Sequence, residues 1–243
     1  MDLGRLQKTK QFNDLGYVVI KNLINNPEHY YKRLKTIEPN RKDDWFPEVP
    51  SFSNDDVIIS LHSEVEEKLE ELLNMELERT YNYCRIYNKN DKLRLHKDRA
   101  ACEISVTLAL DYKGDKPWDI WLADYDEEVH AVSLEPGDAL LYRGTDLLHW
   151  RDSNPNEEST QAFLHYVNAK GQYSMYAGDF NHEKFIEKPY KVNNNKFKDP
   201  IKMLGVVFDG SREKVYDDVD CTKSDITLND KEKEAVRMMG CNI

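Results

Sequence analysis

The chain has 243 residues, of which 40% are hydrophobic and 33% are charged. This composition is typical of a folded globular protein, and the length allows one large domain, or one domain with an appendage, around a sizeable core. The net charge is −11, from 34 basic and 45 acidic side chains. A negative field of this size repels phosphate backbones, so we expect no nucleic-acid partner.

The cysteines argue against a zinc knuckle or a disulfide framework, because they are far apart and form no CxxC pair. They are Cys84, Cys102, Cys221 and Cys241. The N-terminal segment MDLGRLQKTKQFNDLG lacks the apolar core of a signal peptide, and no stretch has the length of a membrane span. We therefore expect a cytoplasmic protein with free thiols and no membrane partner; the sequence leaves the oligomeric state open.

The N-terminal part of the chain favours helices around one strand. Residues 3–13 are predicted to form a short amphipathic helix that ends before Gly16, and residues 17–20 an apolar strand. Residues 27–37 suggest a second helix.

The clearest predicted helix covers residues 63–74. Ser63 suits an N-cap, and Glu66 three residues later completes a capping box. Val65 and Leu69 then fall on one face of the helix, together with Leu72 or Leu73.

From residue 79 onward the pattern changes to short segments rich in β-branched and aromatic residues, separated by turn signals such as Pro136-Gly137-Asp138. The predicted strands are 79–87, 102–112, 118–122, 129–133, 138–142, 146–150 and 160–167. Closely spaced strands after helices indicate a mainly β protein with flanking helices (α+β), of which a double-sheet jelly roll is the simplest form.

Beyond residue 170 the signals weaken. Residues 188–200 are polar and irregular, and residues 228–239 favour a final helix. We expect a main domain over residues 1–187 and a C-terminal extension over residues 188–243 that packs on it.

Two side chains that lie two positions apart carry the functional signal. On an extended strand His96 and Asp98 point the same way, which suits adjacent corners of a metal polyhedron. His149 is the natural third ligand, because it follows a Pro-Gly-Asp turn and an apolar strand. Two imidazoles and one carboxylate on one face of a metal leave positions for a co-substrate and oxygen, as non-haem iron(II) requires.

An HxD pair alone is a weak signal, since the two side chains could simply hydrogen-bond on a surface loop. The context favours a metal site: the pair lies between strands, and the second histidine stands where a jelly roll can bring it close.

The segments YCRIYNKNDKLRLHKD, CEISVTLAL, LEPGDALLYRGTDLLHW and QAFLHYV resemble the iron(II)/2-oxoglutarate-dependent oxygenase superfamily, in the style of its prolyl-hydroxylase-like branch. The phrase FNDLGYVVIKNLI resembles the family's helix-strand entry, so the resemblance covers roughly residues 12–168.

The resemblance implies a double-stranded β-helix (jelly roll, cupin-like) with iron held by His96, Asp98 and His149. It implies a dioxygenase, a hydroxylase or related enzyme that uses Fe(II), 2-oxoglutarate and O2 to oxidise a C–H bond of a small-molecule or peptidyl substrate, with succinate as co-product. Two alternatives stay open: a cupin-like metalloenzyme that does not use 2-oxoglutarate, and a non-catalytic jelly-roll binding module.

The sequence departs from the family pattern in one respect. Members usually carry Arg or Lys about ten residues after the distal histidine to bind the far carboxylate of 2-oxoglutarate, and this chain has none there. Arg151 is the nearest substitute, with Arg143 and Arg85 behind it, because a guanidinium can make two parallel bonds to a carboxylate. The alternative is that Arg151 forms a surface pair with a neighbouring aspartate.

Three further residues are weaker candidates for binding the co-substrate. Tyr87 and Tyr83 share one face of a strand and could donate their hydroxyls, or could simply be core aromatics. Thr107 lies on a polar strand face with Ser105, which could face either a site or solvent. Among the other histidines, we expect His29, His62 and His182 at the surface, His130 in the core or at an edge, and His165 on the closing strand, where it could approach the site.

Overall fold

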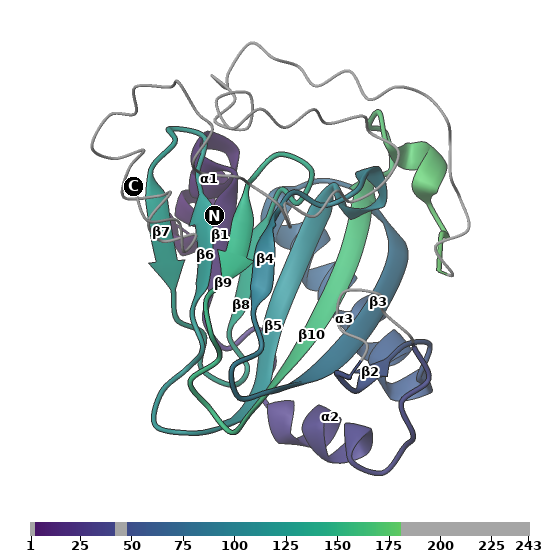
Figure 1. Cartoon of the computed structure of the whole chain (residues 1–243). Helices are drawn as coiled ribbons and strands as arrows, with labels where there is room; N and C mark the ends of the chain where they lie inside the picture. The colour runs from purple at the N-terminus through teal and green to yellow at the C-terminus, as the bar shows by residue number, and fades with distance from the viewer. Residues whose placement is uncertain (1–2, 42–47, 181–243) are drawn as a thin grey trace, which may run out of the picture.

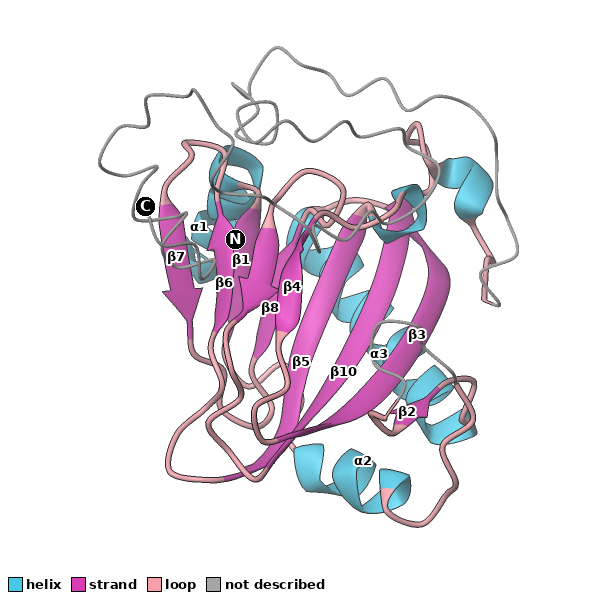
Figure 2. Ribbon diagram, viewed as in Figure 1, coloured by secondary structure: helices cyan, strands magenta, loops and turns pink. Residues whose placement is uncertain are grey.

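Two antiparallel sheets face each other in the part of the chain that the structure, a computed structural model, describes: residues 3–41 and 48–180 (Figures 1 and 2). The larger sheet has the strand order β1 (Tyr17–Ile20), β8 (Ala139–Tyr142), β5 (Ile104–Lys113), β10 (Glu158–Asn168), β3 (Leu77–Asn88) and β2 (Ser51–Phe52). The smaller sheet has the order β4 (Leu93–His96), β9 (His149–Arg151), β6 (Ile120–Ala123) and β7 (Val129–Val132). The predicted mainly β jelly roll with flanking helices is confirmed.

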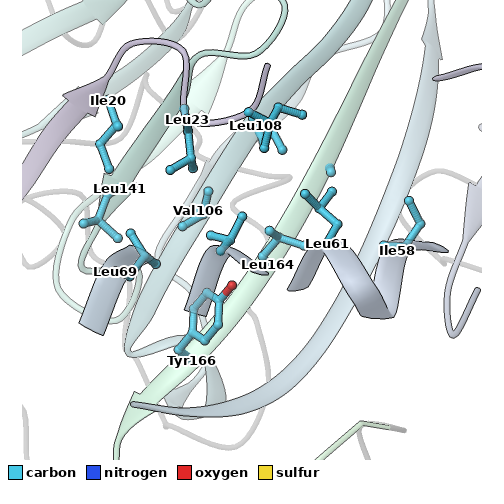
Figure 3. Packing of buried hydrophobic residues seen from close by; sticks show 14 of the residues in the cluster. Ile20, Leu23, Ile58, Leu61, Leu69, Val106, Leu108, Leu141, Leu164 and Tyr166 are labelled. Atoms are coloured by element: carbon cyan, nitrogen blue, oxygen red, sulfur yellow. The ribbon is translucent and has the colours of Figure 1, made fainter. Parts of the chain in front are cut away.

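Three helices accompany the larger sheet: α1 (Leu3–Leu15), α2 (Pro27–Leu34) and α3 (Asp56–Leu73). The helix α3 crosses behind β10 and β3, on the side away from the smaller sheet (Figure 1). The main core fills this space, where Ile58, Leu61 and Leu69 of α3 meet strand residues (Figure 3). The strand residues labelled in Figure 3 are Ile20, Val106, Leu108, Leu141, Leu164 and Tyr166.

Strand alternation gives the two faces of the larger sheet different characters. On β5, Ile104, Val106 and Leu108 belong to the core under the helices. The residues between them must face the smaller sheet, because successive side chains of a strand point to opposite faces. Ser105 and Thr107 are among them, and both are fully buried. A polar strip therefore runs between the sheets, as the alternation on this strand suggested.

The predicted start of the third helix at Ser63 is wrong. The helix α3 begins at Asp56, and Asp55 is its N-cap, with its carboxylate accepting from the backbone N–H of Val57 at 3.0 Å. Ser63 lies inside the helix, because the apolar face extends back to Ile58 and Leu61. The Ser-x-x-Glu pattern was therefore a coincidence within a longer helix.

The other differences from the predicted elements are local. The short strands β2 and β4 were not predicted, the strand expected at 102–112 starts at Ile104 after a 3-10 turn, Ala100–Cys102, and the strand expected at 146–150 is shifted to His149–Arg151. A second 3-10 turn, Ser174–Tyr176, follows β10.

Several predictions fall outside the described residues and stay predictions. They are the loop 188–200, the helix 228–239, the domain boundary with its 188–243 extension, and the state of Cys221 and Cys241. Cys84 and Cys102 are buried free thiols. Among the described helices, none has the length and apolar character to cross a bilayer.

Candidate metal centre

Neighbouring strands place the three predicted ligands together. His96 and His149 are directly opposite each other in the pairing of β4 with β9, and their ring centroids lie 4.2 Å apart. Asp98 follows β4, where its backbone N–H donates to the carbonyl of Gly144 at 2.8 Å. The Nε2 atoms of His96 and His149 lie 3.4 and 3.5 Å from Asp98 Oδ1. The structure thus brings His149 next to His96 and Asp98, which lie far from it in the sequence.

The hydrogen bonds of the two imidazoles turn their lone pairs toward Asp98. His96 Nδ1 donates to the carbonyl of Arg94 at 2.8 Å, and His149 Nδ1 donates to the carbonyl of Leu147 at 3.1 Å. Because a carbonyl only accepts, each Nδ1 carries the proton when the ring is neutral, and each Nε2 then presents a lone pair that can bind a metal.

The protonation states at the centre also suit a metal. Burial lowers the pKa of His149, and the neighbouring His96 lowers it further, so the ring is held neutral. The hydroxyl of Ser105 donates to Asp98 Oδ2 at 3.0 Å, and a hydrogen bond to the charged form favours the ionised carboxylate. Neutral imidazoles and a carboxylate are the forms that bind metal.

The spacing of the donor atoms fits a divalent first-row ion. Ligand atoms at right angles with bonds of about 2.1 Å would lie about 3.0 Å apart. The distances of 3.4 and 3.5 Å from Asp98 Oδ1 exceed this by a few tenths of an ångström, which small side-chain rotations remove. Two nitrogens and one oxygen on one side of an ion form the donor set that suits iron(II).

Three residues around Asp98 were not predicted to have roles at the centre. Ser105 Oγ donates to Asp98 Oδ2 at 3.0 Å, and the hydroxyl of Tyr142 lies 3.4 Å from both Asp98 Oδ2 and His149 Nε2. At Gly144 an added Cβ would lie 2.3 Å from Asp98 Oδ2, so only glycine fits. The polar alternation on β5 pointed to Ser105, but the sequence carries no comparable signal for the other two.

Arg151 lies inside the protein and not at its surface, with 1% of its area exposed. Its Nη1 donates to the carbonyl of Trp118, and its Nη2 donates to Thr107 Oγ1 at 3.3 Å and Gln161 Oε1 at 3.4 Å. No carboxylate of the described residues forms an ion pair with it, and burial lowers its pKa to about 10. The alternative of a surface pair with an aspartate is therefore wrong.

The remaining co-substrate candidates divide by position. Thr107 contacts Arg151 directly, and Tyr87 is buried against Trp118 with ring centroids 5.1 Å apart. Tyr83 is half-buried and stacks on Phe163.

Arg85 and Arg143, the two other arginines considered for binding the carboxylate, lie in different parts of the fold. Arg85 Nη1 donates to the Tyr87 hydroxyl at 3.3 Å, so it lies near the same region. Arg143 lies over the ring of Phe12 in α1, and this position argues against a role between the sheets.

The expectation that His62 lies at the surface is wrong. This side chain is 1% exposed and lies between α3 and the larger sheet, where its Nε2 donates to the carbonyl of His165 at 3.1 Å. Burial lowers the pKa of His62 to about 3. The polar neighbours of His62 in the sequence concealed its place on the apolar face of a helix longer than predicted.

The other histidines lie close to expectation. His29 is exposed, and His130 is half-buried beside Asp124, 2.6 Å from its carboxylate. His165 does approach the centre, because its Nδ1 lies 2.9 Å from Ser105 Oγ. His182 lies outside the described residues.

Comparison with solved structures identifies the fold. The chain matches the non-haem α-ketoglutarate-dependent epimerase SnoN from nogalamycin biosynthesis with a TM-score of 0.58 and 11% identity, over 68% of this chain and 81% of that one. It matches HygX from Streptomyces hygroscopicus, solved with nickel, 2-oxoglutarate and hygromycin B, with a TM-score of 0.56 and 13% identity, over 68% and 87% of the two chains. It matches a Pseudomonas putida prolyl-4-hydroxylase with a TM-score of 0.52 and 13% identity, over 66% and 98%.

These structural neighbours are iron/2-oxoglutarate oxygenases, and the chain shares their double-stranded β-helix fold. Searches of protein-family models and of curated protein sequences find no match. At these identities the likeness establishes the fold, and the activity has to be argued from the site itself.

Proposed function

We propose that this protein is an iron(II)- and 2-oxoglutarate-dependent dioxygenase that hydroxylates, or otherwise oxidises, a C–H bond of a small molecule or a peptidyl side chain. The observation that carries the proposal is the convergence of His96, Asp98 and His149, whose ligand atoms lie within 4.8 Å of one another. Structures of the same fold have been solved with Fe3+ and α-ketoglutarate, and with nickel and 2-oxoglutarate.

The metal would be held by the two Nε2 atoms and by the carboxylate of Asp98. When bound, iron with 2-oxoglutarate supplies oxygen activation: the keto acid loses CO2 to become succinate, and the two atoms of O2 enter the succinate and the hydroxylated product. The chain's own contribution is to orient the ligands. Backbone carbonyls fix both imidazole rings, and Ser105 fixes Asp98.

Arg151 would bind the distal carboxylate of 2-oxoglutarate. It stands two residues after His149 on β9, so both side chains point between the sheets, about 6.8 Å apart along the strand. A five-carbon dicarboxylate that chelates the metal at one end spans a similar length. A buried guanidinium without a carboxylate partner is suited to a carboxylate ligand.

Residues beside Arg151 would complete this end of the site. The Thr107 hydroxyl, now in contact with Arg151, can donate to the same carboxylate. Tyr87 packs in one cluster with Trp118 and Phe163, and the ring of Trp118 lies under the guanidinium of Arg151. The Tyr87 hydroxyl would therefore face the same carboxylate, and the surrounding rings would exclude water.

The experiment measures succinate formed by the purified protein with Fe(II), 2-oxoglutarate and O2, without any added substrate. We expect slow turnover by the wild type and none by Asp98→Ala. Arg151→Lys keeps the positive charge but loses the planar guanidinium that can make two parallel bonds to a carboxylate, so this variant should need a much higher 2-oxoglutarate concentration for turnover. Arg143→Lys is the matched control and should behave as wild type.

Two outcomes would contradict the proposal. Iron binding without any consumption of 2-oxoglutarate would favour the cupin-like metalloenzyme, and a wild type that binds neither would favour a binding module. Equal 2-oxoglutarate requirements for both lysine variants would remove Arg151 from its assigned role.

A further inference from the structure

We propose that His165 is a positioning residue that holds the metal ligand Asp98 through Ser105, and that its own Nε2 is a hydrogen-bond acceptor for a molecule bound beside the metal. The proposal rests on the proposed function, because it concerns the same centre. No interaction of the metal triad itself requires His165, so its role has to come from the contacts that its ring makes.

Ser105 Oγ lies between His165 and Asp98 and contacts both side chains. It lies 3.0 Å from Asp98 Oδ2, 2.9 Å from His165 Nδ1 and 3.1 Å from the carbonyl of Cys102. Ser105 and His165 are direct partners in the pairing of β5 with β10, so the sheet itself sets their separation. Both residues are almost fully buried, at 0% and 2% exposed, which excludes competing water.

The direction of the protons follows from the acceptors. A hydroxyl has one proton to donate, and the ionised Asp98 can only accept a hydrogen bond. The negative charge of Asp98 therefore favours the arrangement in which the Ser105 hydroxyl donates to this carboxylate. Ser105 Oγ then accepts from His165, which requires the proton of the neutral ring on Nδ1. The opposite tautomer would direct the hydroxyl proton to His165 and leave an oxygen lone pair against the carboxylate.

This tautomer leaves a lone pair on His165 Nε2. That atom is buried and has no hydrogen-bond partner among the described residues. The ring lies beside two tyrosines, 4.6 Å from the ring of Tyr81 and 5.9 Å from that of Tyr83, between centroids. A buried acceptor without a partner is costly unless a ligand supplies a donor. The group that meets it would therefore be an N–H or O–H.

A second metal site does not account for the same residues. Asp98, Cys102 and His165 do offer ligand atoms within 4.8 Å of one another. However, the Ser105 hydroxyl already bonds to two of these side chains, and Cys102 Sγ is 2.9 Å from the Tyr81 hydroxyl. The cluster is thus a hydrogen-bonded support for Asp98.

The first test is a Co2+ titration of the metal-free protein, followed by absorption. Loss of a residue that supports a metal ligand typically weakens binding about 10- to 100-fold, and we expect this for Ser105→Ala. We expect His165→Leu to weaken binding in the same direction, whereas His165→Asn places an amide donor near the Nδ1 position and should restore affinity close to wild type. Ser159→Ala, a matched control at another fully buried serine, should bind as wild type.

The outcomes separate the two proposals. If the wild type binds Co2+ no better than His96→Ala, the metal centre fails, and the role of His165 fails with it. If the wild type binds and His96→Ala does not, but Ser105→Ala and His165→Leu match the wild type, only the role of His165 is overturned. The role of His165 is also overturned if His165→Asn binds Co2+ as weakly as His165→Leu does. Thermal melts that show both variants folded are the control for this comparison.

The second test reads the tautomer without metal or activity. In protein labelled with 15N at histidine, NMR should show His165 with a protonated Nδ1 and an unprotonated Nε2. A proton on Nε2 would contradict both the support of Asp98 and the acceptor facing the bound molecule.

Discussion

At the scale of single residues, Arg151 gives the strongest support for the proposed ligand site between the sheets. A guanidinium that is 1% exposed and unpaired with any described carboxylate is a cost to stability. Its Nε also has no hydrogen-bond partner among the residues that the structure describes. Proteins tolerate such costs where the group has a function, and strongly perturbed ionisable groups accordingly gather at active sites.

We expect Arg151→Met to separate function from stability. The free energy of unfolding of the metal-free protein should change by less than about 2 kcal/mol, because relief of a buried unpaired charge offsets the lost hydrogen bonds. The rise in melting temperature that 2-oxoglutarate gives the Mn2+-loaded wild type should disappear. A loss of roughly 3 to 5 kcal/mol in urea unfolding, with 2-oxoglutarate binding retained, would instead mark Arg151 as a structural residue.

The sequence predicted some residues of the centre and missed others for a physical reason. His96 and Asp98 were recognisable because they lie two residues apart, so the pattern is visible within a short stretch of sequence. His149 was recognisable because a turn and a strand precede it. The contact of Ser105 with His165 and the tight fit at Gly144 depend on which strands pair and in what register. That information is not local, so no short pattern carries it.

At the scale of elements, the beginning of α3 shows how a good local motif can mislead. The pattern Ser63-x-x-Glu66 satisfies the rule for a capping box, but Asp55 already caps a longer helix. Arg33 from α2 also pairs with Asp55, at 2.8 Å, so the cap joins two helices. The decisive signal, the apolar positions Ile58 and Leu61, lies before the motif.

Two alanine substitutions test this boundary. Asp55→Ala removes the acceptor for the N–H of Val57, and we expect a loss of about 0.5 to 2 kcal/mol in the free energy of unfolding. Ser63→Ala should be neutral or slightly stabilising, because alanine is the better residue inside a helix. Chemical denaturation of both variants measures the difference; a larger loss for Ser63→Ala would restore the shorter helix.

The turn Pro136-Gly137-Asp138 joins the strand β8 to the β1–α2 loop. The carboxylate of Asp138 accepts from Lys21 Nζ at 2.7 Å, from the N–H of Asn22 at 2.9 Å and from the N–H of Glu135 at 3.1 Å. At Gly137 φ is +94°, and an added Cβ would lie 2.7 Å from the carbonyl of Ile24. The turn that the sequence singled out is therefore a junction in the fold.

The stability that Asp138 provides should depend on pH. Burial raises its pKa, but the bonds from Lys21 and the two backbone amides outweigh this and lower the pKa below its usual value. A lowered pKa stabilises the folded state above the unfolded pKa of about 3.9, and this contribution disappears as pH falls further. We expect Asp138→Asn to lose about 1 to 3 kcal/mol at pH 7. The gap to wild type should narrow below pH 4, and a gap that is constant down to pH 2 would contradict the assignment.

At the scale of the whole molecule, two layers with different roles make up the fold. The helices and the outer face of the larger sheet form an apolar core, whereas the space between the sheets holds Ser105, Thr107, Gln161 and Arg151 among its buried polar groups. Alternation along β5 predicted the two faces, and the strand spacing predicted a jelly roll. The pairing of β4 with β9, which creates the centre, could not be predicted because both strands are very short.

Binding at the centre should stabilise the entire fold, because its ligands come from two paired strand regions, at β4 and β9, that lie far apart in the sequence. A metal present at 100 times its dissociation constant contributes about 2.7 kcal/mol when it binds only the folded state. We expect Mn2+ to raise the melting temperature of the wild type, a chelator to reverse the rise, and His149→Ala to abolish it. An equal rise in His149→Ala would indicate binding elsewhere.

The most direct measurement is a crystal structure of the wild type grown anaerobically with Mn2+ and 2-oxoglutarate. We expect one anomalous peak in contact with His96 Nε2, Asp98 Oδ1 and His149 Nε2, with the far carboxylate of the keto acid on the guanidinium of Arg151. An ion bound at any other place, or a keto acid turned away from Arg151, would contradict the proposed function.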